Sequence, residues 1–474
     1  MTKQTTLVWF RQDLRIKDNP ALNWAVEQGS IIPLYILDEE SQDVEALGGA
    51  SKWWLHHSLE SLNKSLDGHL VIRQGKAEDV LAELVSSLKV NAVVWNRRYE
   101  PGELQRDKAI KQQLKDAGLA VKSFNGSLLW EPMSVVKKDG TPYKVYTPYY
   151  RNGCLGESSP RYPLSAPSEI TFSAYKQSNG SIEQLDLIPS VDWAEGFSSL
   201  WKPGEAGAST KLSRFIEHAA KGYREQRNLP SVEGTSKLSP HLHFGEMSPN
   251  QAWYAILDAF GGSDNDSIDT YLSELGWREF SYYLLYHWPQ ITTDNFNPKF
   301  DHFPWSTDQQ ALKTWQRGQT GVPIVDAGMR ELWQTGFMHN RVRMVVGSFL
   351  VKNLLLDWRE GAKWFWDCLL DADLAANTAS WQWVAGSGAD AAPYFRIFNP
   401  ILQGEKFDKQ GEYVKTYCPE LSKLPAKYIH KPWEAPESVL AAADILLGTN
   451  YPKPVVDLKE SRQRALGAYE KVKG

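Results

Sequence analysis

The stretch TLVWF (6–10), followed after a helical pattern by IIPLYIL (31–37), determines the fold class of the N-terminal part. Helical patterns such as 52–66 and 77–88 separate these segments from three further short apolar runs: LVIR (70–73), AVVW (92–95) and AVKSF (120–124). Apolar strands alternating with helices are typical of a parallel sheet that is buried on both faces. We therefore predict an α/β domain over residues 1–130 with a doubly wound, five-stranded parallel sheet. Such sheets often bind a ligand at the carboxyl ends of their strands.

The rest of the chain divides into a connector and a helical part. The first strand is followed by RQDLR (11–15) and not by GxGxxG, so an ordinary NAD domain is excluded. Over residues 131–208 the periodicity fades, and SSPRYPLSAPSE (158–169) is rich in Pro and Ser, which predicts an interdomain linker. Residues 209–474 are predicted to form an all-α domain, with helices at 210–227, 249–260, 268–286 and 341–357.

Composition narrows the class of protein. The 474 residues are 42% hydrophobic and 23% charged, which is ordinary for a globular enzyme. A net charge of −5 argues against a surface coated in basic charge, although a local basic patch remains compatible with it. Three widely spaced cysteines predict neither a disulfide framework nor a zinc site, and no signal peptide or membrane span is evident. We expect a cytoplasmic protein.

One segment near the C-terminus concentrates acidic, amide and indole groups. Asp371 and Asp373 directly precede AANTASW (375–381), and Trp305 and Trp358 lie further upstream of Trp381. Such groups suit a redox-active aromatic cofactor better than a hydrolytic site. Since the chain holds 20 tryptophans, packing is the simplest role for any single indole.

Two upstream segments carry polar groups at helical spacing. Thr235, Ser236 and Ser239 crowd an expected helix N-terminus, which could cradle a phosphate or be a plain cap. Glu274, Trp277 and Arg278 stand at i, i+3 and i+4, so they share one helix face. That face could hydrogen-bond and stack on a base, or it could be an ion pair beside a core tryptophan.

A third segment, MHNRVRM (338–344), places Asn340 and Arg341 near Met344. Arg343 stands two positions from Arg341 and points elsewhere along the helix. It is expected to pair inward with Asp371, while Arg341 faces a phosphate.

Four sequence blocks, in their order along the chain, resemble those of the DNA photolyases of the photolyase/cryptochrome family. The resemblance is strongest to the bacterial cyclobutane pyrimidine dimer (CPD) photolyases. These blocks are EGTSKLSPHLHFGEMSP (233–249), ELGWREF (274–280), TGVPIVDAGMRELWQTGFMHNRVRM (320–344) and DADLAANTASWQWVAGSGADAAPYFRIFNP (371–400). The similarity extends over nearly the whole chain. It implies a light-dependent carbon–carbon lyase that binds DNA containing CPDs, acts as a monomer and associates with the bacterial nucleoid.

The resemblance also implies bound FAD, with residues that match the family's contacts. The residues expected near the phosphates are Tyr223, Thr235, Ser236, Leu238 and Ser239. Those expected beside the isoalloxazine and ribityl parts are Arg278, Asn340, Arg343, Asp371 and Asp373, with Asn377 facing flavin N5. A neutral amide is compatible with the reduced anionic flavin, FADH⁻, whereas an Asp would disfavour it by like-charge repulsion.

The implied reaction is light-driven and redox-neutral: excited FADH⁻ gives an electron to the dimer, the cyclobutane ring splits and the electron returns. Trp381, Trp358 and Trp305 match the family's electron-transfer chain for photoreduction. Glu274 is expected to hydrogen-bond the flipped-out bases, which cost only a few kcal/mol to extrude when damaged. The other expected lesion or DNA contacts are Trp277, Trp383, Asn340, Met344, Arg227, Arg341 and Arg396.

Two alternatives in the family stay open, a 6-4 photolyase and a cryptochrome-type blue-light receptor. The sequence MHNRVRM departs from the 6-4 pattern, while Glu274, Trp277 and Asn377 match the repair pattern. For the light-harvesting antenna, Glu103 resembles a folate-contacting glutamate, although Gly102 replaces its usual Asn neighbour. We expect 5,10-methenyltetrahydrofolate first, 8-hydroxy-5-deazaflavin second, and an empty site third.

Overall fold

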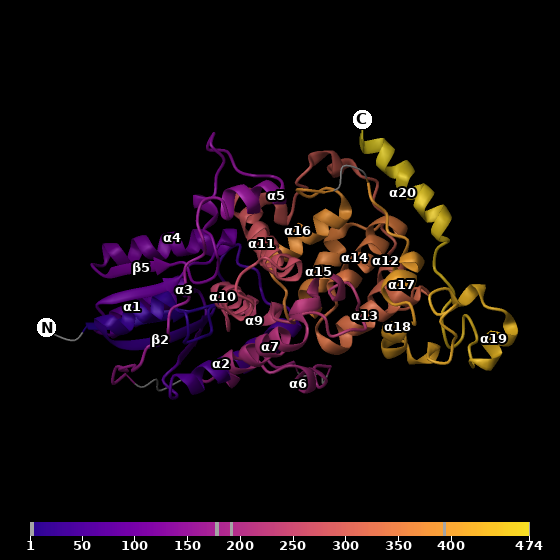
Figure 1. The fold of residues 1–474 in the computed structure, drawn as a ribbon. Helices are drawn as coiled ribbons and strands as arrows, with labels where there is room; N and C mark the ends of the chain where they lie inside the picture. Colours follow the sequence, from indigo (N-terminus) through magenta and orange to yellow (C-terminus); the bar gives the residue numbers. More distant parts are fainter. Residues whose placement is uncertain (1–3, 176–179, 190–192, 392–394, 474) are drawn as a thin grey trace.

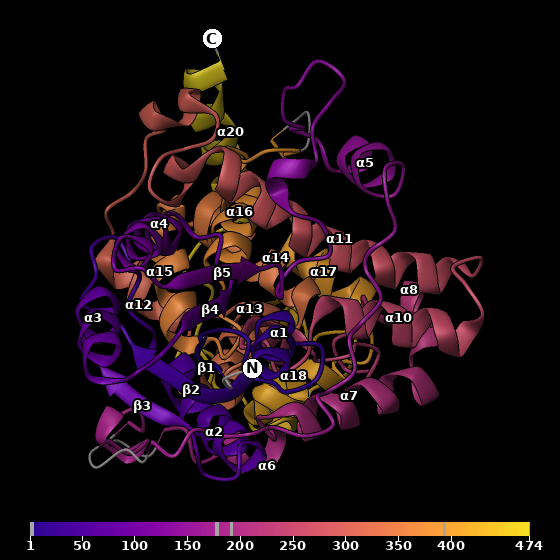
Figure 2. The ribbon, with the colours of Figure 1, turned by 90° about the vertical axis from the view of Figure 1, so that its left-hand side faces the viewer.

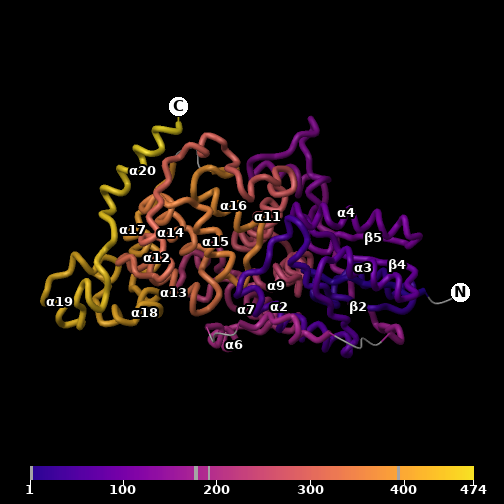
Figure 3. Tube along the Cα trace, turned by 180° about the vertical axis from the view of Figure 1, so that it is seen from behind, coloured from indigo at the N-terminus to yellow at the C-terminus, as the bar shows by residue number. Residues whose placement is uncertain are grey.

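The computed structural model describes residues 4–175, 180–189, 193–391 and 395–473. The α/β part and the helical part lie side by side, and the two ends of the chain lie far apart (Figure 1). The view from behind shows the same arrangement, with α20 (Leu458–Lys473) along the outer side of the helical part (Figure 3). No helix among the described residues is long and apolar enough to cross a membrane.

Five parallel strands form one sheet in the order β3-β2-β1-β4-β5, which confirms the predicted doubly wound sheet. The strands are β1 (Gln4–Phe10), β2 (Gly29–Leu37), β3 (Val71–Gln74), β4 (Ala92–Asn96) and β5 (Ala120–Phe124). Helices α1 (Pro20–Gln28) and α2 (Gly49–Ser65) cover one face, while α3 (Ala77–Ser87) and α4 (Pro101–Asp116) cover the other (Figure 2).

Alternation along β1 explains why both faces of the sheet are apolar. Val8 and Phe10 pack with the residues of α1 and α2, whereas Leu7 and Trp9 pack with those of α3 and α4. Successive strand residues point to opposite faces, so a continuous apolar run buries both sides.

The connection between the two parts contains α5 (Tyr146–Pro148), a π turn at Tyr149–Cys154 and α6 (Phe197–Leu200). The helical part comprises α7 (Glu205–His218), α8 (Tyr223–Gln226), α9 (Ser239–His243), α10 (Pro249–Phe260), α11 (Asp266–His287), α12 (Gln309–Gln316), α13 (Pro323–Thr335), α14 (Asn340–Ser348), α15 (Trp358–Cys368), α16 (Leu374–Ala385), α17 (Pro400–Phe407), α18 (Glu412–Tyr417), α19 (Glu437–Ala442) and α20. The helices predicted at 249–260 and 268–286 are confirmed, since they match α10 and α11.

The helix predicted over 210–227 is wrong as one continuous element. The chain leaves the α conformation at Ala219 (φ −123°) and again at Gly222, and α8 then begins at Tyr223. The break lets the ring of Tyr223 pack against Phe215 and Tyr271, at 5.5 and 5.3 Å between centroids. Burial of the Tyr223 ring is therefore favoured over a continuous helix, which Gly222 already destabilises.

The helix predicted over 341–357 also needs correction. Helix α14 ends at Ser348 and widens into a π turn at Phe349–Asn353. Leu355 then adopts a left-handed backbone (φ 56°), and its carbonyl accepts a hydrogen bond from the amide of Ser306 at 2.7 Å. A tertiary backbone contact thus ends the helix where helical propensity alone would continue it.

Candidate functional site

The central helix α11 presents two members of the predicted trio, Glu274 and Trp277, on its surface, whereas the prediction that Arg278 shares this face is wrong, because its guanidinium bonds to the carbonyl of Ser127 and to Glu279. Glu274 accepts a hydrogen bond from Arg227 Nη1 at 2.5 Å, and both side chains are partly exposed. Trp277 stacks on Tyr146 of α5, with 3.7 Å between ring centroids and 12° between planes. The same helix face therefore carries a carboxylate and a rigidly supported indole, as its spacing predicts.

The charge of Glu274 is set by two opposing effects. Burial raises the pKa of this carboxyl, and the guanidinium of Arg227 lowers it without cancelling the burial effect. A carboxyl with a raised pKa and a single ionic partner is suited to exchanging that partner for the N–H and O groups of a ligand.

Arg278 turns inward from the same helix. Its Nη1 donates to the carbonyl of Ser127 and to Glu279 Oε1, each at 3.0 Å, and its guanidinium lies 5.0 Å from the ring of Tyr282. Glu279 is fully buried and also accepts from the amide of Leu129 at 2.8 Å. Burial raises the pKa of Glu279 to about 7. Arg278 and Glu279 together bind the N-terminal chain to the helical part.

Asp371 forms the predicted inward pair with Arg343, which is confirmed. Arg343 Nη2 donates to both carboxylate oxygens, at 3.0 and 2.9 Å, while its Nε donates to the carbonyl of Met338 at 2.8 Å. The carboxylate is buried, so the pair is a charge-assisted contact with little competition from water.

Asp373 caps α16, where its Oδ1 accepts from the amide of Ala376 at 2.8 Å. Its second oxygen accepts from the hydroxyl of Tyr282 and faces His243 Nδ1 at 3.4 Å. Burial alone would raise the pKa of Asp373, but the hydrogen bond and charge of His243, together with Arg278, bring it below its usual value. Asp373 therefore stays anionic in the interior.

One turn along α16, Asn377 is half-buried and its Nδ2 donates to the carbonyl of Ala362 at 3.0 Å. That hydrogen bond fixes the amide orientation and leaves its oxygen free to face a ligand. On the same helix, Trp381 is buried against Gly361 and the ring of Phe365, 4.9 Å away.

Trp358 and Trp305 lie in or against the same apolar core as Trp381. Trp358 is fully buried and its Nε1 donates to Asn295 Oδ1 at 3.0 Å. Trp305 is half-buried and contacts Phe303 at 4.4 Å between centroids. Two of the three indoles are therefore buried, and Trp305 is partly exposed.

The expected phosphate segment leads into α9, which begins at Ser239, so the predicted helix start is confirmed. Leu238 is buried at the cap position, whereas Thr235 and Ser236 are half-buried in the preceding loop. Lys237 adopts a left-handed backbone (φ 50°), which turns the loop sharply beside these hydroxyls. Tyr223 is buried nearby and packs on Tyr271.

Asn340 and Arg341 begin α14, and Asn340 is exposed. Arg341 lies near Met344 as predicted, with 3.7 Å from Nη1 to Sδ, and its Nη2 donates to Asn228 Oδ1 at 2.5 Å. Its guanidinium also stacks over Phe407 at 4.5 Å. This arginine is held by weak neutral contacts and has no carboxylate partner among the described residues.

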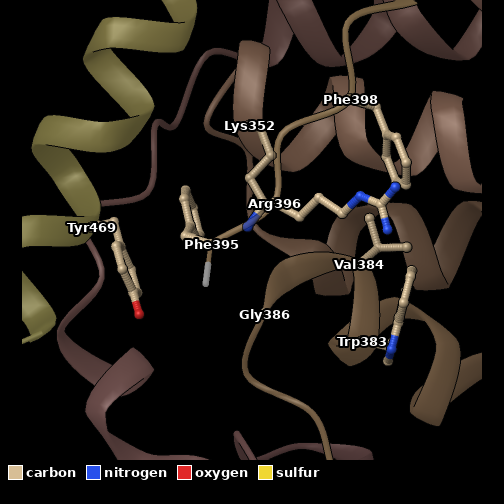
Figure 4. Close-up of a pocket in the computed structure, with 8 residues that line it drawn as sticks. All are labelled: Lys352, Trp383, Val384, Gly386, Phe395, Arg396, Phe398 and Tyr469. Carbon is tan, nitrogen blue, oxygen red and sulfur yellow. The ribbon is translucent and has the colours of Figure 1, made fainter. Parts of the chain in front are cut away.

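Trp383 and Arg396 line one pocket together, although 12 residues separate them in the chain (Figure 4). The guanidinium of Arg396 extends toward Phe398, 4.9 Å from its ring, and away from Phe395 and Tyr469. Residues 392–394 of the motif block 371–400 lie outside the described residues.

Comparison with known proteins agrees with this geometry. Residues 6–167 match a family model described as DNA photolyase, and residues 271–471 match one described as the FAD binding domain of DNA photolyase. A deoxyribodipyrimidine photo-lyase from Agrobacterium fabrum is 52% identical over 472 residues, which cover 98% of each chain. The chain belongs to the photolyase/cryptochrome family.

A further photolyase and a cryptochrome of the family also match the chain. The crystal structure of a bacterial class III photolyase from Agrobacterium tumefaciens matches with a TM-score of 0.96 and 51% identity, covering 100% of this chain and 98% of that one. Cryptochrome-2 of Arabidopsis thaliana is 39% identical over 481 residues, which cover 97% of this chain and 77% of the relative. The chain is therefore similar both to photolyases and to a plant cryptochrome.

A second pocket of this family member lies at the carboxyl ends of the strands, the edge where a parallel sheet is expected to bind ligands. Glu103 lines it, together with Arg98, Arg106 and Tyr35 of the α/β part and Trp366 of the helical part. Arg98 donates to Glu103 at 3.3 Å, and burial raises the pKa of Glu103, with Glu100 adding to the shift.

Three groups that complete the site were not predicted from the sequence. Tyr282 stands four residues after Arg278 on α11, so helical spacing could have indicated it. His243 follows the phosphate segment, and its contact with Asp373 joins residues 130 positions apart. Tyr146 lies in the linker, where neither periodicity nor a motif points to Trp277.

Proposed function

We propose that this protein repairs cyclobutane pyrimidine dimers in DNA by light-driven electron transfer from bound FAD. The observation that carries the proposal is the full-length identity of 52% to a deoxyribodipyrimidine photo-lyase. The α11 face adds to it, because Glu274 and Trp277 offer a hydrogen-bonding and stacking surface for bases.

The donor groups of the helical part fit FAD. The hydroxyls of Thr235, Ser236 and Ser239 at the start of α9 suit the phosphates. The anionic Asp371 and Asp373 and the cationic Arg278 suit the polar edge and the ribityl chain. These residues would hold the flavin as FADH⁻, which would supply light-driven single-electron chemistry for splitting the dimer.

The chain's own residues bind and orient the substrate. Glu274 exchanges Arg227 for the N–H and O groups of the dimer, and the released Arg227 faces a flanking phosphate. Trp277, supported by Tyr146, and Trp383 form apolar walls that exclude water. Asn340 and Met344 complete the pocket, while Arg341 and Arg396 form the local basic surface that an acidic protein needs for DNA. Trp381, Trp358 and Trp305 carry electrons inward during photoreduction.

The pocket around Glu103 is the place for an antenna, and 5,10-methenyltetrahydrofolate is the chromophore that we propose for it. Charged groups on both sides, Glu103 and the arginines at 98 and 106, suit the polar ring and glutamate tail of a folate. Glu103→Gln should lower the rate of repair per incident near-UV photon and remove the folate absorbance, while binding to dimer-containing DNA in darkness stays unchanged. Full folate occupancy in this variant would contradict the assignment.

The decisive experiment uses purified, photoreduced protein and oligothymidine that carries cyclobutane dimers. We expect absorbance of the thymine band to recover under near-UV to blue light and not in darkness. No recovery with normal flavin absorbance would refute CPD repair, and an oligonucleotide with a 6-4 lesion would then test the second photolyase substrate. Gel filtration of the same sample tests the proposed monomer.

A receptor role is the second candidate, since Arabidopsis Cryptochrome-2 matches over 97% of this chain. Asn377 separates the two candidates: a neutral amide tolerates FADH⁻, while the Asp of plant-type cryptochromes opposes it. Light-dependent repair by the purified protein would settle the choice in favour of the enzyme.

A further inference from the structure

A cluster of two imidazoles and a carboxylate lies on α2, outside every site described above. His56, His57 and Glu60 fall within five consecutive positions of that helix. Glu60 Oε2 lies 2.9 Å from His57 Nδ1, and its Oε1 lies 3.5 Å from His56 Nε2. One ligand atom from each residue lies within 4.8 Å of the other two. Among the described residues, this is the one group of three such side chains that converges in this way.

We propose that His56, His57 and Glu60 bind a transition-metal cation of the zinc class. Zn²⁺ takes imidazole nitrogens and carboxylate oxygens at about 2.0–2.2 Å, which separates tetrahedral ligand atoms by about 3.3 Å. The distances of 2.9 and 3.5 Å already bracket that separation. Small side-chain rotations would therefore admit the ion, and a single helix holds all three ligands in place.

The surroundings orient the ligands and leave an entry path. The ring of His57 packs edge-on against Trp53, at 4.6 Å between centroids, which restricts its rotation. His56 is buried, His57 is half-buried and Glu60 is exposed, so the cluster opens to solvent on the side of the carboxylate. Water can then fill a remaining coordination position.

Glu183, which begins the short helix Glu183–Leu185, adds a further negative charge near His56. Ile182 and Leu185 on either side of it are buried in the same apolar core as α2, which holds this segment in position. Mg²⁺ and Ca²⁺ fit poorly, because they prefer all-oxygen ligands.

The test is calorimetric titration of the flavin-loaded full chain, first treated with chelator, with Zn²⁺ and separately with Mg²⁺. We expect one Zn²⁺ to bind and Mg²⁺ to give no signal at the same concentrations. Loss of a partner that merely orients a metal ligand costs about 10- to 100-fold in affinity, so His57→Ala, which removes a ligand, should cost at least about 100-fold. Glu60→Gln should also weaken binding and tests the site independently if His57→Ala does not fold.

A matched control is His218→Ala. His218 is an exposed imidazole beside a carboxylate, 3.6 Å from Glu217, but it has no third ligand. This variant should bind Zn²⁺ as the parent does. Equal Zn²⁺ affinity in His57→Ala, or equally tight Mg²⁺ binding by the parent, would overturn the proposal.

Discussion

The proposed lesion side of the helical part (Arg227, Glu274, Trp277, Arg341) and its proposed flavin side (Arg343, Asp371, Asp373, Asn377) use similar residue types in different surroundings. The two flavin-side carboxylates are buried: both oxygens of Asp371 accept from Arg343, and Asp373 accepts from the amide of Ala376 and the hydroxyl of Tyr282. The lesion-side carboxylate is partly exposed and has one ionic partner. A resident group favours a rigid, prearranged shell, whereas a substrate that enters and leaves needs partners that can be exchanged.

The largest effect should come from breaking the flavin-side pair with Arg343→Met. This change leaves the buried carboxylate of Asp371 without a partner, and loss of one member of a buried pair costs about 3–5 kcal/mol. Urea unfolding should show that loss of stability, and the ratio of flavin to protein absorbance should fall after purification.

Arg214→Met is the matched control, since Arg214 pairs with Glu233 at the open surface. Such pairs contribute little because water and salt screen them. Equal unfolding midpoints for the two variants would show that burial adds nothing to the Arg343–Asp371 pair.

The next effect concerns pH and the buried Glu279. Its pKa is raised from 4.5 to about 7, so the folded protein binds this proton more tightly than the unfolded chain. Its contribution to stability is therefore complete below pH 4.5 and is lost as the pH rises through 7. Relative to Glu279→Gln, the parent should lose about 3 kcal/mol of unfolding free energy between pH 4.5 and 8. Parallel stability curves for the two proteins would contradict the buried, protonated carboxyl.

A smaller effect is expected on the lesion side from Trp277→Ala. Stacking of a base on an aromatic ring contributes about 1–3 kcal/mol, so affinity for dimer-containing DNA should fall about 5- to 150-fold. Flavin content should stay at the parental level, because Trp277 stacks on Tyr146 outside the flavin side. Trp333→Ala removes a half-exposed indole from α13 and serves as control. Parental affinity in Trp277→Ala, measured by fluorescence anisotropy, would refute the pocket.

The two sides also differ in how far the sequence reveals them. The i, i+3 spacing of Glu274 and Trp277 on α11 and the opposite directions of Arg341 and Arg343 follow from helix geometry, so both were predictable. The inward turn of Arg278 was not, because its hydrogen bond to Ser127 joins residues 151 positions apart. The stack of Tyr146 on Trp277 was not, because it joins an aperiodic linker to a helix 131 residues later. The end of the helix before Leu355 was also not predictable, because a tertiary hydrogen bond to Ser306 imposes the left-handed backbone of Leu355.

The smallest effect should come from Asn377→Asp, on the flavin side. Burial of a second negative charge beside reduced flavin should destabilise it by about 1.4 kcal/mol and speed its oxidation in air about tenfold. Asn297→Asp is the control, since Asn297 caps a helical turn and Asp caps equally well. If Asn377→Asp keeps the reduced flavin as long as the parent and Asn297→Asp do, the amide has no part in selecting FADH⁻. The distinction between repair enzyme and receptor would then have to come from the proposed lesion side, at Glu274 and Trp277.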